Sequence, residues 1–262
     1  MQKLRIAIGC AVIFIANPGL AFGGLISRGG GLVYDDVLDV TWLQNGNYGA
    51  GSIYDNGVSA TDGIMSWANA VAWADDLVYY DSVRNVHWDD WRLPHAKPVN
   101  GVSYQYERSF DGSTDLGWNI VSPQSEFSHL FYVSLDNIGL RDINGNSPPN
   151  EGLFDDPLNP NDESLFENIQ SAYWTGTPYL APEVGRVPFA FDFIMGGGTQ
   201  SRAFSHGADH SAWAVRDGDV AALAVPEPMS AVIVVLMNAI DVGFRRRRQG
   251  PAMRLKRCVC PA

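Results

Sequence analysis

Residues 142–146, with the sequence DINGN, carry oxygen-bearing side chains at the spacing that opens a calcium-binding loop. Asp142, Asn144 and Asn146 stand at alternate positions, and Gly145 permits a tight turn between them. An EF-hand is excluded, because Leu153 stands where that loop needs a bidentate glutamate. Further ligands would come from acidic residues downstream, namely Glu151, Asp155, Asp156 or Asp162. Calcium is one expectation; a solvated turn is the other, because Asp and Asn favour turns by bonding their own backbone.

Two histidines near the C-terminal end of the body have a spacing that zinc ligands also use. Gly207 lies between His206 and His210 and argues against the helix that would align the two rings, so we expect exposed loop histidines instead. Ser205 precedes His206, yet the sequence identifies no third member of a hydrolase triad. The chain therefore favours binding over catalysis, and a secreted enzyme with an unrecognised site, for example a hydrolase, is the alternative.

Tryptophans occur in several motifs, and we expect most of them in the core. Any that are left exposed would be candidate platforms for sugar rings. Arg92 and Arg216 stand within these motifs, and we expect each to pair with a buried Asp rather than to bind a ligand. The tryptophans concerned are Trp42, Trp67, Trp91, Trp174 and Trp213.

Local patterns predict the elements that position these residues. Residues 31–44 alternate partly around an Asp-Asp turn and predict a β-hairpin. Residues 66–78 place apolar side chains on one helical face, with Ser66 as the N-cap. Ser122-Pro123 has the composition of a second helix start, with a buried stripe that follows it. The face of the first helix comprises Trp67, Ala70, Val71, Ala74, Leu77 and Val78, and the stripe of the second comprises Phe127, Leu130 and Phe131.

The second half of the chain predicts a long loop followed by strands. Residues 136–164 are polar, acidic and Pro-rich and indicate a loop. Residues 171–177, 187–197 and 211–218 read as strands. Two helices followed by short Trp-rich strands predict a single α+β domain over residues 22–223.

Charge is distributed unevenly and indicates export. Residues 22–225 contain 27 acidic and nine basic residues, a net charge of −18, which excludes nucleic acid as an expected partner. Residues 1–21 have a basic start, an apolar run and small residues at the end, as in a secretory signal peptide. The chain's three cysteines all lie outside the exported body, so a disulfide framework and a cysteine nucleophile are excluded there.

The C-terminal end combines an extended motif, an apolar run and a basic cluster. Pro226, Glu227 and Pro228 precede the apolar residues 229–244, which we expect to form a short membrane helix. Four arginines would keep the end of this helix inside the cell by the positive-inside rule. These membrane-orienting residues are Arg245, Arg246, Arg247 and Arg248, and a basic tail over residues 249–262 follows them.

This C-terminal arrangement, over residues 224–248, resembles a PEP-CTERM sorting signal. The class occurs in Gram-negative bacteria that make extracellular polysaccharide. The resemblance implies a signal peptidase and an exosortase as partners, with cleavage at the Pro-Glu-Pro motif. We therefore expect an inner-membrane-anchored precursor that becomes a cell-surface or extracellular protein.

The body also resembles a known family. The motifs DDVLDVTWLQ, SWANAVAWADDL, WRLP, SEFSHLFY, YWTGT, AFDFIMGG and AWAVRDG occur in the order found in the Lcl C-terminal-like domain. This resemblance spans roughly residues 32–220 and implies a C-type-lectin-like α+β fold, related to that of formylglycine-generating enzymes, with short antiparallel strands and no catalytic set. We expect the domain to bind an extracellular glycan, a protein or a cation.

Overall fold

The computed structural model describes residues 24–59, 61–149, 165–182 and 188–223. The chain divides into two compact units, Met1–Val220 and Ala221–Ala262, and every site discussed below lies in the first. The second unit is described only for residues 221–223, within the short 3-10 helix Val220–Leu223. The expected signal peptide, Pro-Glu-Pro motif, membrane helix and arginine cluster lie outside the described residues.

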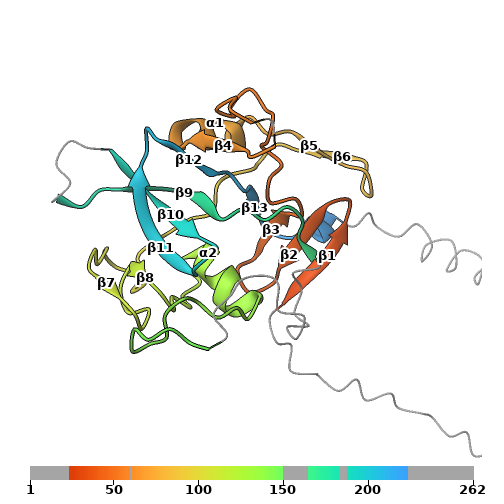
Figure 1. Cartoon of the computed structure of the whole chain (residues 1–262). Coiled ribbons are helices and arrows are strands. Elements are labelled where there is room, and N and C mark those ends of the chain that lie inside the picture. Colours follow the sequence, from red (N-terminus) through yellow and green to blue (C-terminus); the bar gives the residue numbers. More distant parts are fainter. Residues whose placement is uncertain (1–23, 60, 150–164, 183–187, 224–262) are drawn as a thin grey trace, which may run out of the picture. The chain divides into compact units, whose positions relative to one another are not determined.

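Two larger sheets, one antiparallel with four strands and one mixed with seven, organise the first unit (Figure 1). The four-stranded sheet has the order β1 (Leu25–Gly29), β2 (Leu32–Asp35), β3 (Val40–Leu43) and β13 (Val215–Asp217). The seven-stranded sheet has the order β4 (Ile64–Ser66), β12 (Ala208–Ser211), β9 (Ala172–Tyr179), β10 (Phe189–Ile194), β11 (Thr199–Phe204), β8 (Leu116–Gly117) and β7 (Arg108–Ser109). A separate hairpin joins β5 (Tyr79–Asp81) to β6 (Val86–Trp88).

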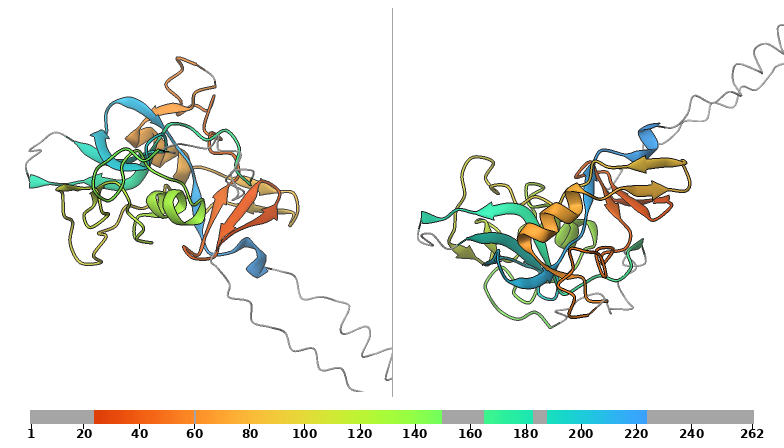
Figure 2. Two further views of the ribbon diagram at one scale, coloured as in Figure 1. Left: turned by 60° about the horizontal axis from the view of Figure 1, so that its bottom comes forward. Right: turned by 90° about the horizontal axis from the view of Figure 1, so that it is seen from above.

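Two short helices accompany the seven-stranded sheet and lie on its opposite faces (Figure 2). They are α1 (Trp67–Asp75) and α2 (Glu126–His129), and a π-helical turn over Leu130–Ser134 continues α2. Sheets of mixed pairing with two short helices make the fold α+β, as predicted. None of the helices within the described residues has the length and apolar character that crossing a membrane requires.

The predicted hairpin over residues 31–44 is confirmed as β2 and β3. The buried carboxylate of Asp35 closes its turn, because the backbone N–H groups of Val37 and Leu38 donate to Oδ1 at 3.1 and 3.0 Å. Asp39, with φ of 53°, completes the reversal. The turn thus depends on local side-chain bonds that the two aspartates in the sequence already indicated.

The first helix begins as predicted but ends early. The hydroxyl of Ser66 accepts the backbone N–H of Asn69 at 3.3 Å, which is an N-cap bond. The helix stops at Asp75, so Leu77 and Val78 lie beyond it, and Val78 is 58% exposed. The predicted helical face was therefore wrong at its C-terminal end. The buried residues of the observed helix are Ala70, Trp73 and Ala74.

The second helix begins later than predicted. Ser122 and Pro123 form a turn, in which the backbone N–H of Ser125 donates to the carbonyl of Ser122 at 3.1 Å. The helix itself begins at Glu126, with Ser125 at the N-cap position. Its expected stripe is confirmed, because Phe127, Leu130 and Phe131 are all buried.

The C-terminal strands differ from the prediction in two places. Strand β11 was not predicted, although it pairs with β10 over its whole length. Residues 211–218 do not form one strand: β12 ends at Ser211 and β13 begins at Val215. Between them the chain passes from the seven-stranded to the four-stranded sheet through Ala212, Trp213 and Ala214, all buried.

The core lies around this crossing segment. Trp42, Trp174 and Trp213 are fully buried, and Trp91 is nearly so, which confirms the expected core positions. The indole N–H of Trp213 donates to the carbonyl of Leu43 at 2.7 Å. The indole N–H of Trp174 donates to the carbonyl of Met65 at 2.8 Å.

Trp67 is the exception among the expected core tryptophans. Its side chain is only half-buried, while its indole N–H bonds the carbonyl of Thr175 at 2.8 Å. The predicted loop over residues 136–164 contains no helix or strand as far as residue 149, and residues 150–164 lie outside the described part.

Candidate functional site

The DINGN loop forms a turn that uses its own carboxylate. The backbone N–H groups of Asn144 and Asn146 donate to Oδ1 of Asp142 at 2.8 and 2.9 Å, and the Asn146 side-chain amide donates to Oδ2 at 3.3 Å. These bonds, led by that of the Asn146 backbone, hold the pKa of Asp142 below its usual value. Glu151, expected as a further ligand with three later aspartates, lies outside the described residues. The three oxygen-bearing residues thus come together as an Asx turn, and calcium binding remains a prediction.

The two histidines with zinc-like spacing do not share a site. His206 is exposed, as expected, but His210 is not. The Nε2 atom of His210 lies 2.7 Å from Oδ2 of Asp192, and its ring stacks on Trp174 with centroids 4.5 Å apart. Only 10% of the His210 side chain and 3% of the Asp192 side chain are exposed. The expectation of two exposed loop histidines was therefore wrong for His210, because β12 places its ring on the sheet.

The His210–Asp192 pair lacks the partners of a catalytic group. The second ring nitrogen of His210, Nδ1, and the second oxygen of Asp192, Oδ1, are buried and bond nothing among the described residues. Within those residues, no three His, Cys, Asp or Glu side chains gather closely enough to hold a metal ion. The pair therefore joins β12 to β10 across β9 as a buried polar contact.

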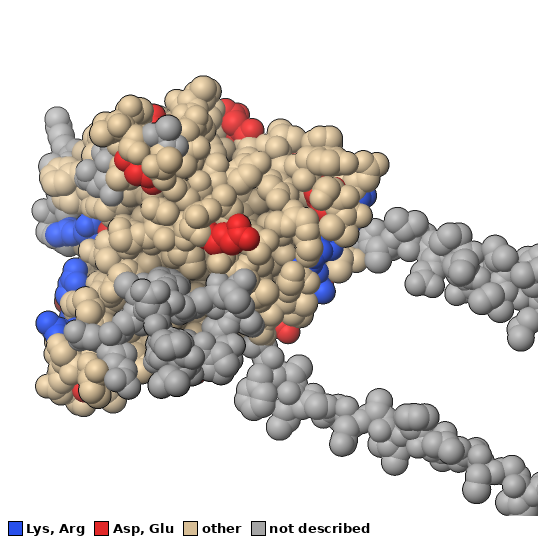
Figure 3. Space-filling view, turned by 45° about the vertical axis from the view of Figure 1, so that its right-hand side comes forward, with Lys and Arg blue, Asp and Glu red and all other residues tan. Residues whose placement is uncertain are grey.

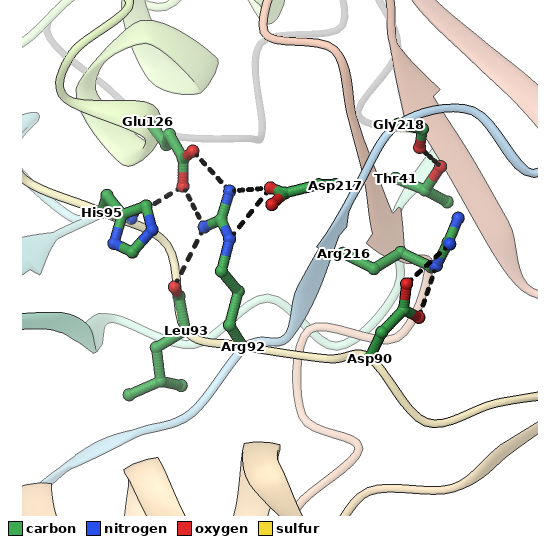
Figure 4. A network of polar contacts seen from close by, with 9 residues as sticks. All are labelled: Thr41, Asp90, Arg92, Leu93, His95, Glu126, Arg216, Asp217 and Gly218. Atoms are coloured by element: carbon green, nitrogen blue, oxygen red, sulfur yellow. Dashed lines mark hydrogen bonds and ion pairs between the residues drawn. The ribbon is translucent and has the colours of Figure 1, made fainter.

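A denser set of charges surrounds Arg92, and Figure 4 shows it from close by. The guanidinium binds both oxygens of Glu126 at 2.8 Å, and its Nε and one terminal nitrogen bind Asp217 at 3.0 and 2.6 Å. The backbone N–H of His95 donates to the same Glu126 carboxylate at 2.7 Å. We call Arg92, Glu126, Asp217 and His95 the Arg92 junction.

Electrostatics in the Arg92 junction are satisfied internally. Burial works against the charge of Arg92, but Glu126 and Asp217 together raise its pKa above the ordinary value. Burial, aided by the Arg92 charge, lowers the pKa of His95. Arg92 joins α2 to β13 and so acts as a structural tie, as expected. Its aspartate partner, Asp217, is 79% exposed rather than buried, and Glu126 supplies the buried carboxylate.

Arg216 makes the second expected ion pair. Its guanidinium binds both oxygens of Asp90 at 2.8 Å and lies 4.2 Å from the centre of the Trp88 ring. The bond from Arg216 lowers the pKa of Asp90. Arg216 itself is buried, but half of the Asp90 side chain is exposed, so the expected buried partner is a surface residue.

A different arrangement lines a pocket of about 220 Å³ beside the end of β3. We call it the tyrosine pocket. Two tyrosines, two amide residues and one glutamate are among the residues that line it. Its lining residues are Gly31, Leu43, Gln44, Asn45, Tyr48, Tyr79 and Glu167.

Backbone bonds between distant segments hold the tyrosine pocket open. The N–H of Gln44 donates to the carbonyl of Gly31, and the N–H of Glu167 donates to the carbonyl of Gln44, both at 2.8 Å. Gly31 has a φ of 80°, and a Cβ there would collide with the Tyr79 hydroxyl group. The wall therefore requires glycine at this position both for conformation and for space.

The two tyrosines differ in how firmly they are held. The Tyr79 hydroxyl donates to the carbonyl of Gly30 at 2.7 Å, and its ring meets the Trp91 ring edge-on at 5.9 Å. Burial, with Tyr48 and Asp81 nearby, raises the pKa of Tyr79, so it remains a neutral donor. Tyr48 meets Tyr79 edge-on at 5.4 Å and is 44% exposed. One ring is thus a fixed wall and the other is open to a ligand.

The polar side chains of the tyrosine pocket are only partly engaged. Asn45 accepts the backbone N–H of Asn47 at 2.9 Å and the side-chain amide of Asn168 at 3.3 Å. Glu167 is exposed, and its carboxylate has no hydrogen-bond or ion-pair partner among the described residues. A single carboxylate with amides and aromatic rings suits recognition of a polar ligand, whereas glycoside hydrolysis commonly uses two carboxylates.

Sequence reasoning missed the tyrosine pocket entirely. Tyr48 and Tyr79 lie outside the periodic apolar patterns, and Glu167 follows the long acidic loop as one carboxylate among many. No protein family model, curated protein or solved structure matches the chain. The geometry of the described residues is therefore the basis for assigning a function.

Proposed function

We propose that this protein is an exported cell-surface or extracellular-matrix protein whose C-type-lectin-like domain binds a glycan without catalysis. The observation that carries the proposal is the tyrosine pocket, whose lining includes Tyr48, Tyr79 and Glu167, a glutamate with no side-chain partner among the described residues. Aromatic rings offer apolar faces to sugar rings, while amides can donate hydrogen bonds to hydroxyls and accept them, and a carboxylate accepts them. The ordered motifs that resemble the Lcl C-terminal-like domain support the same class of function.

The size of the pocket supports a small recognition unit. A volume of about 220 Å³ lies below the roughly 300–1,000 Å³ of pockets that hold drug-sized ligands. One sugar residue at the end or on the side of a longer chain fits this scale. Residues beyond that unit would lie on the open surface around Tyr48.

A glycan array probed with the full chain tests the proposal. We expect binding to a restricted set of glycans, and we expect Tyr48→Ala to abolish it because that variant removes the open aromatic ring. Tyr80→Ala is the matched control, since Tyr80 is similarly exposed but does not line the pocket. Array binding that survives Tyr48→Ala, or no binding at all, would contradict the proposal.

Export and anchoring form the second part of the proposal. Cleavage near Pro226 by an exosortase would convert a membrane-bound precursor into the mature surface protein. The support is the order of the Pro-Glu-Pro motif, apolar run and four arginines in the sequence. In the native host, Glu227→Ala should leave an unshortened precursor, and normal processing of that variant would contradict the sorting proposal.

A further inference from the structure

We infer that the tyrosine pocket selects a ligand carrying an ammonium group beside its hydroxyls, as in a glucosamine unit of a deacetylated amino-sugar polymer. This inference rests on the proposed glycan-binding function and names the class of sugar. It follows from the sign of the charges, the orientation of the rings and the size of the pocket.

The charge on the pocket wall has one sign. Glu167 is the acidic residue among the described residues that line the pocket, and no Lys, Arg or His is among them. Arg84, which donates to the carbonyl of Arg28 in β1, is occupied because it also binds Asp81 at 2.7 Å. A ligand with a carboxylate or sulfate would therefore meet like charge, whereas an ammonium group would meet its counter-ion.

The surrounding surface strengthens this preference. Residues 22–225 carry a net charge of −18, so the domain attracts cationic polymers over distances set by salt. Figure 3 shows acidic residues scattered over one face of the molecule and basic residues confined to its margins. The long-range field and the pocket wall thus favour the same sign of ligand charge.

The tyrosine rings offer a second contact for an ammonium group. Tyr48 and Tyr79 meet at an interplanar angle of 65°, so their faces point in different directions around one cavity. An ammonium group near a tyrosine face gains cation–π attraction, and a carboxylate in the same site adds a charge-assisted hydrogen bond. Because Tyr79 is fixed by Gly30 and Trp91, this wall is formed before any ligand arrives.

The amides distinguish an amino sugar from a simple amine. Gln44 lines the pocket half-buried, and its side-chain amide bonds nothing among the described residues. The side-chain oxygen of Asn45 accepts two hydrogen bonds, while its amide N–H groups bond nothing in the part of the chain that the structure describes. Free amide donors and acceptors match the hydroxyls next to the amino group of a glucosamine unit.

Isothermal titration of the full chain with glucosamine oligomers, and with N-acetylglucosamine oligomers of equal length, tests the inference. We expect the amino form to bind at least about tenfold more tightly, the scale of one charge-assisted hydrogen bond. Glu167→Gln should remove that preference. Glu107→Gln is the matched control, because Glu107 is exposed and does not line the pocket, so the substitution removes the same charge elsewhere on the surface.

The outcomes separate this inference from the proposed function. Equal binding of both oligomers, unchanged in Glu167→Gln, would overturn the ammonium preference while leaving glycan binding intact. An equal loss in Glu107→Gln would also overturn it, because attraction would then be a property of the whole acidic surface. Binding of neither oligomer, combined with an empty glycan array, would overturn both.

Discussion

The Arg92 junction and the tyrosine pocket both gather polar side chains beside the four-stranded sheet, but they treat charge in opposite ways. In the junction, Arg92 has two carboxylates and Glu126 also accepts a backbone N–H. In the pocket, Glu167 has no partner among the described residues. A closed set of ion pairs holds segments together, whereas an open carboxylate remains available to something outside the chain.

The largest expected effect is at the junction. Glu126→Ala leaves half-buried Arg92 with only Asp217 and the carbonyl of Leu93 among the described residues, and it leaves the His95 N–H without its acceptor. Removing one partner of a buried ion pair costs about 3–5 kcal/mol, and we expect about 3 kcal/mol because Asp217 and the carbonyl of Leu93 remain as partners of Arg92. Urea denaturation measures the loss. Glu126→Gln, which keeps an oxygen acceptor, should lose less; a change in Glu126→Ala below about 1 kcal/mol would show that the junction is not a structural tie.

The fixed wall of the pocket gives the next effect. Tyr79→Phe removes the hydroxyl that donates to Gly30 and should cost about 1 kcal/mol. The adjacent Tyr80→Phe is the control, because its hydroxyl bonds Asn85 at the exposed surface and should change stability by only a few tenths of a kcal/mol. Equal losses in the two variants would mean that the Tyr79 hydroxyl is not holding the wall.

The junction also predicts a dependence of stability on pH. Burial and the Arg92 charge lower the pKa of His95, so the folded chain binds this proton less readily than the unfolded chain. The stability that neutral His95 contributes is therefore fully present above the ordinary histidine pKa of about 6.5 and is lost as pH falls through the lower folded pKa. Denaturation at about pH 7.5 and about pH 5 should show a smaller loss for His95→Gln than for the native chain. A greater loss of stability in the variant than in the native chain would contradict the lowered pKa of His95.

The open carboxylate predicts almost no stability effect. Glu167→Gln should change the free energy of unfolding by less than about 0.5 kcal/mol, as is usual for exposed side chains without partners. Thermal melts without ligand provide the measurement. A clear loss of stability would assign Glu167 to the fold and place it with the junction rather than with the pocket.

Asp142 resembles the junction in that its carboxylate is already engaged. Because Asn144 and Asn146 occupy both of its oxygens, we expect equal melting temperatures in excess calcium and in chelator. A rise with calcium that disappears in Asp142→Ala would instead show that the turn opens to bind the cation.

Sequence reasoning succeeded where local bonds decide the structure. Asp35 closes its hairpin and Ser66 caps its helix through neighbours two or three residues away, so both were predictable. It failed for β11, whose polar residues gain their pairing from β10. Ser122-Pro123 was predicted to start a helix and instead forms a turn. The helix starts at Glu126, directly before the buried apolar residues.

The tyrosine pocket could not be predicted for a related reason. Its wall joins residue 31, residues 43–48, residue 79 and residue 167, four stretches that no local rule connects. Backbone bonds between Gly31, Gln44 and Glu167, together with the bond from the Tyr79 hydroxyl to Gly30, bring them to one place. The pocket is thus a product of tertiary structure, whereas the DINGN turn is a product of local sequence.

Strand β13 has a mechanical consequence. A pull applied to the chain just after this strand would act first on its antiparallel pairing with β3. Three ion pairs flank the paired strands β3 and β13. They join Arg92 to Asp217, Arg216 to Asp90 and Arg28 to Asp219. The load therefore spreads to α2, to the segment before Trp91 and to β1. We expect β13 to resist tension as a unit rather than to lose its hydrogen bonds to β3 one at a time.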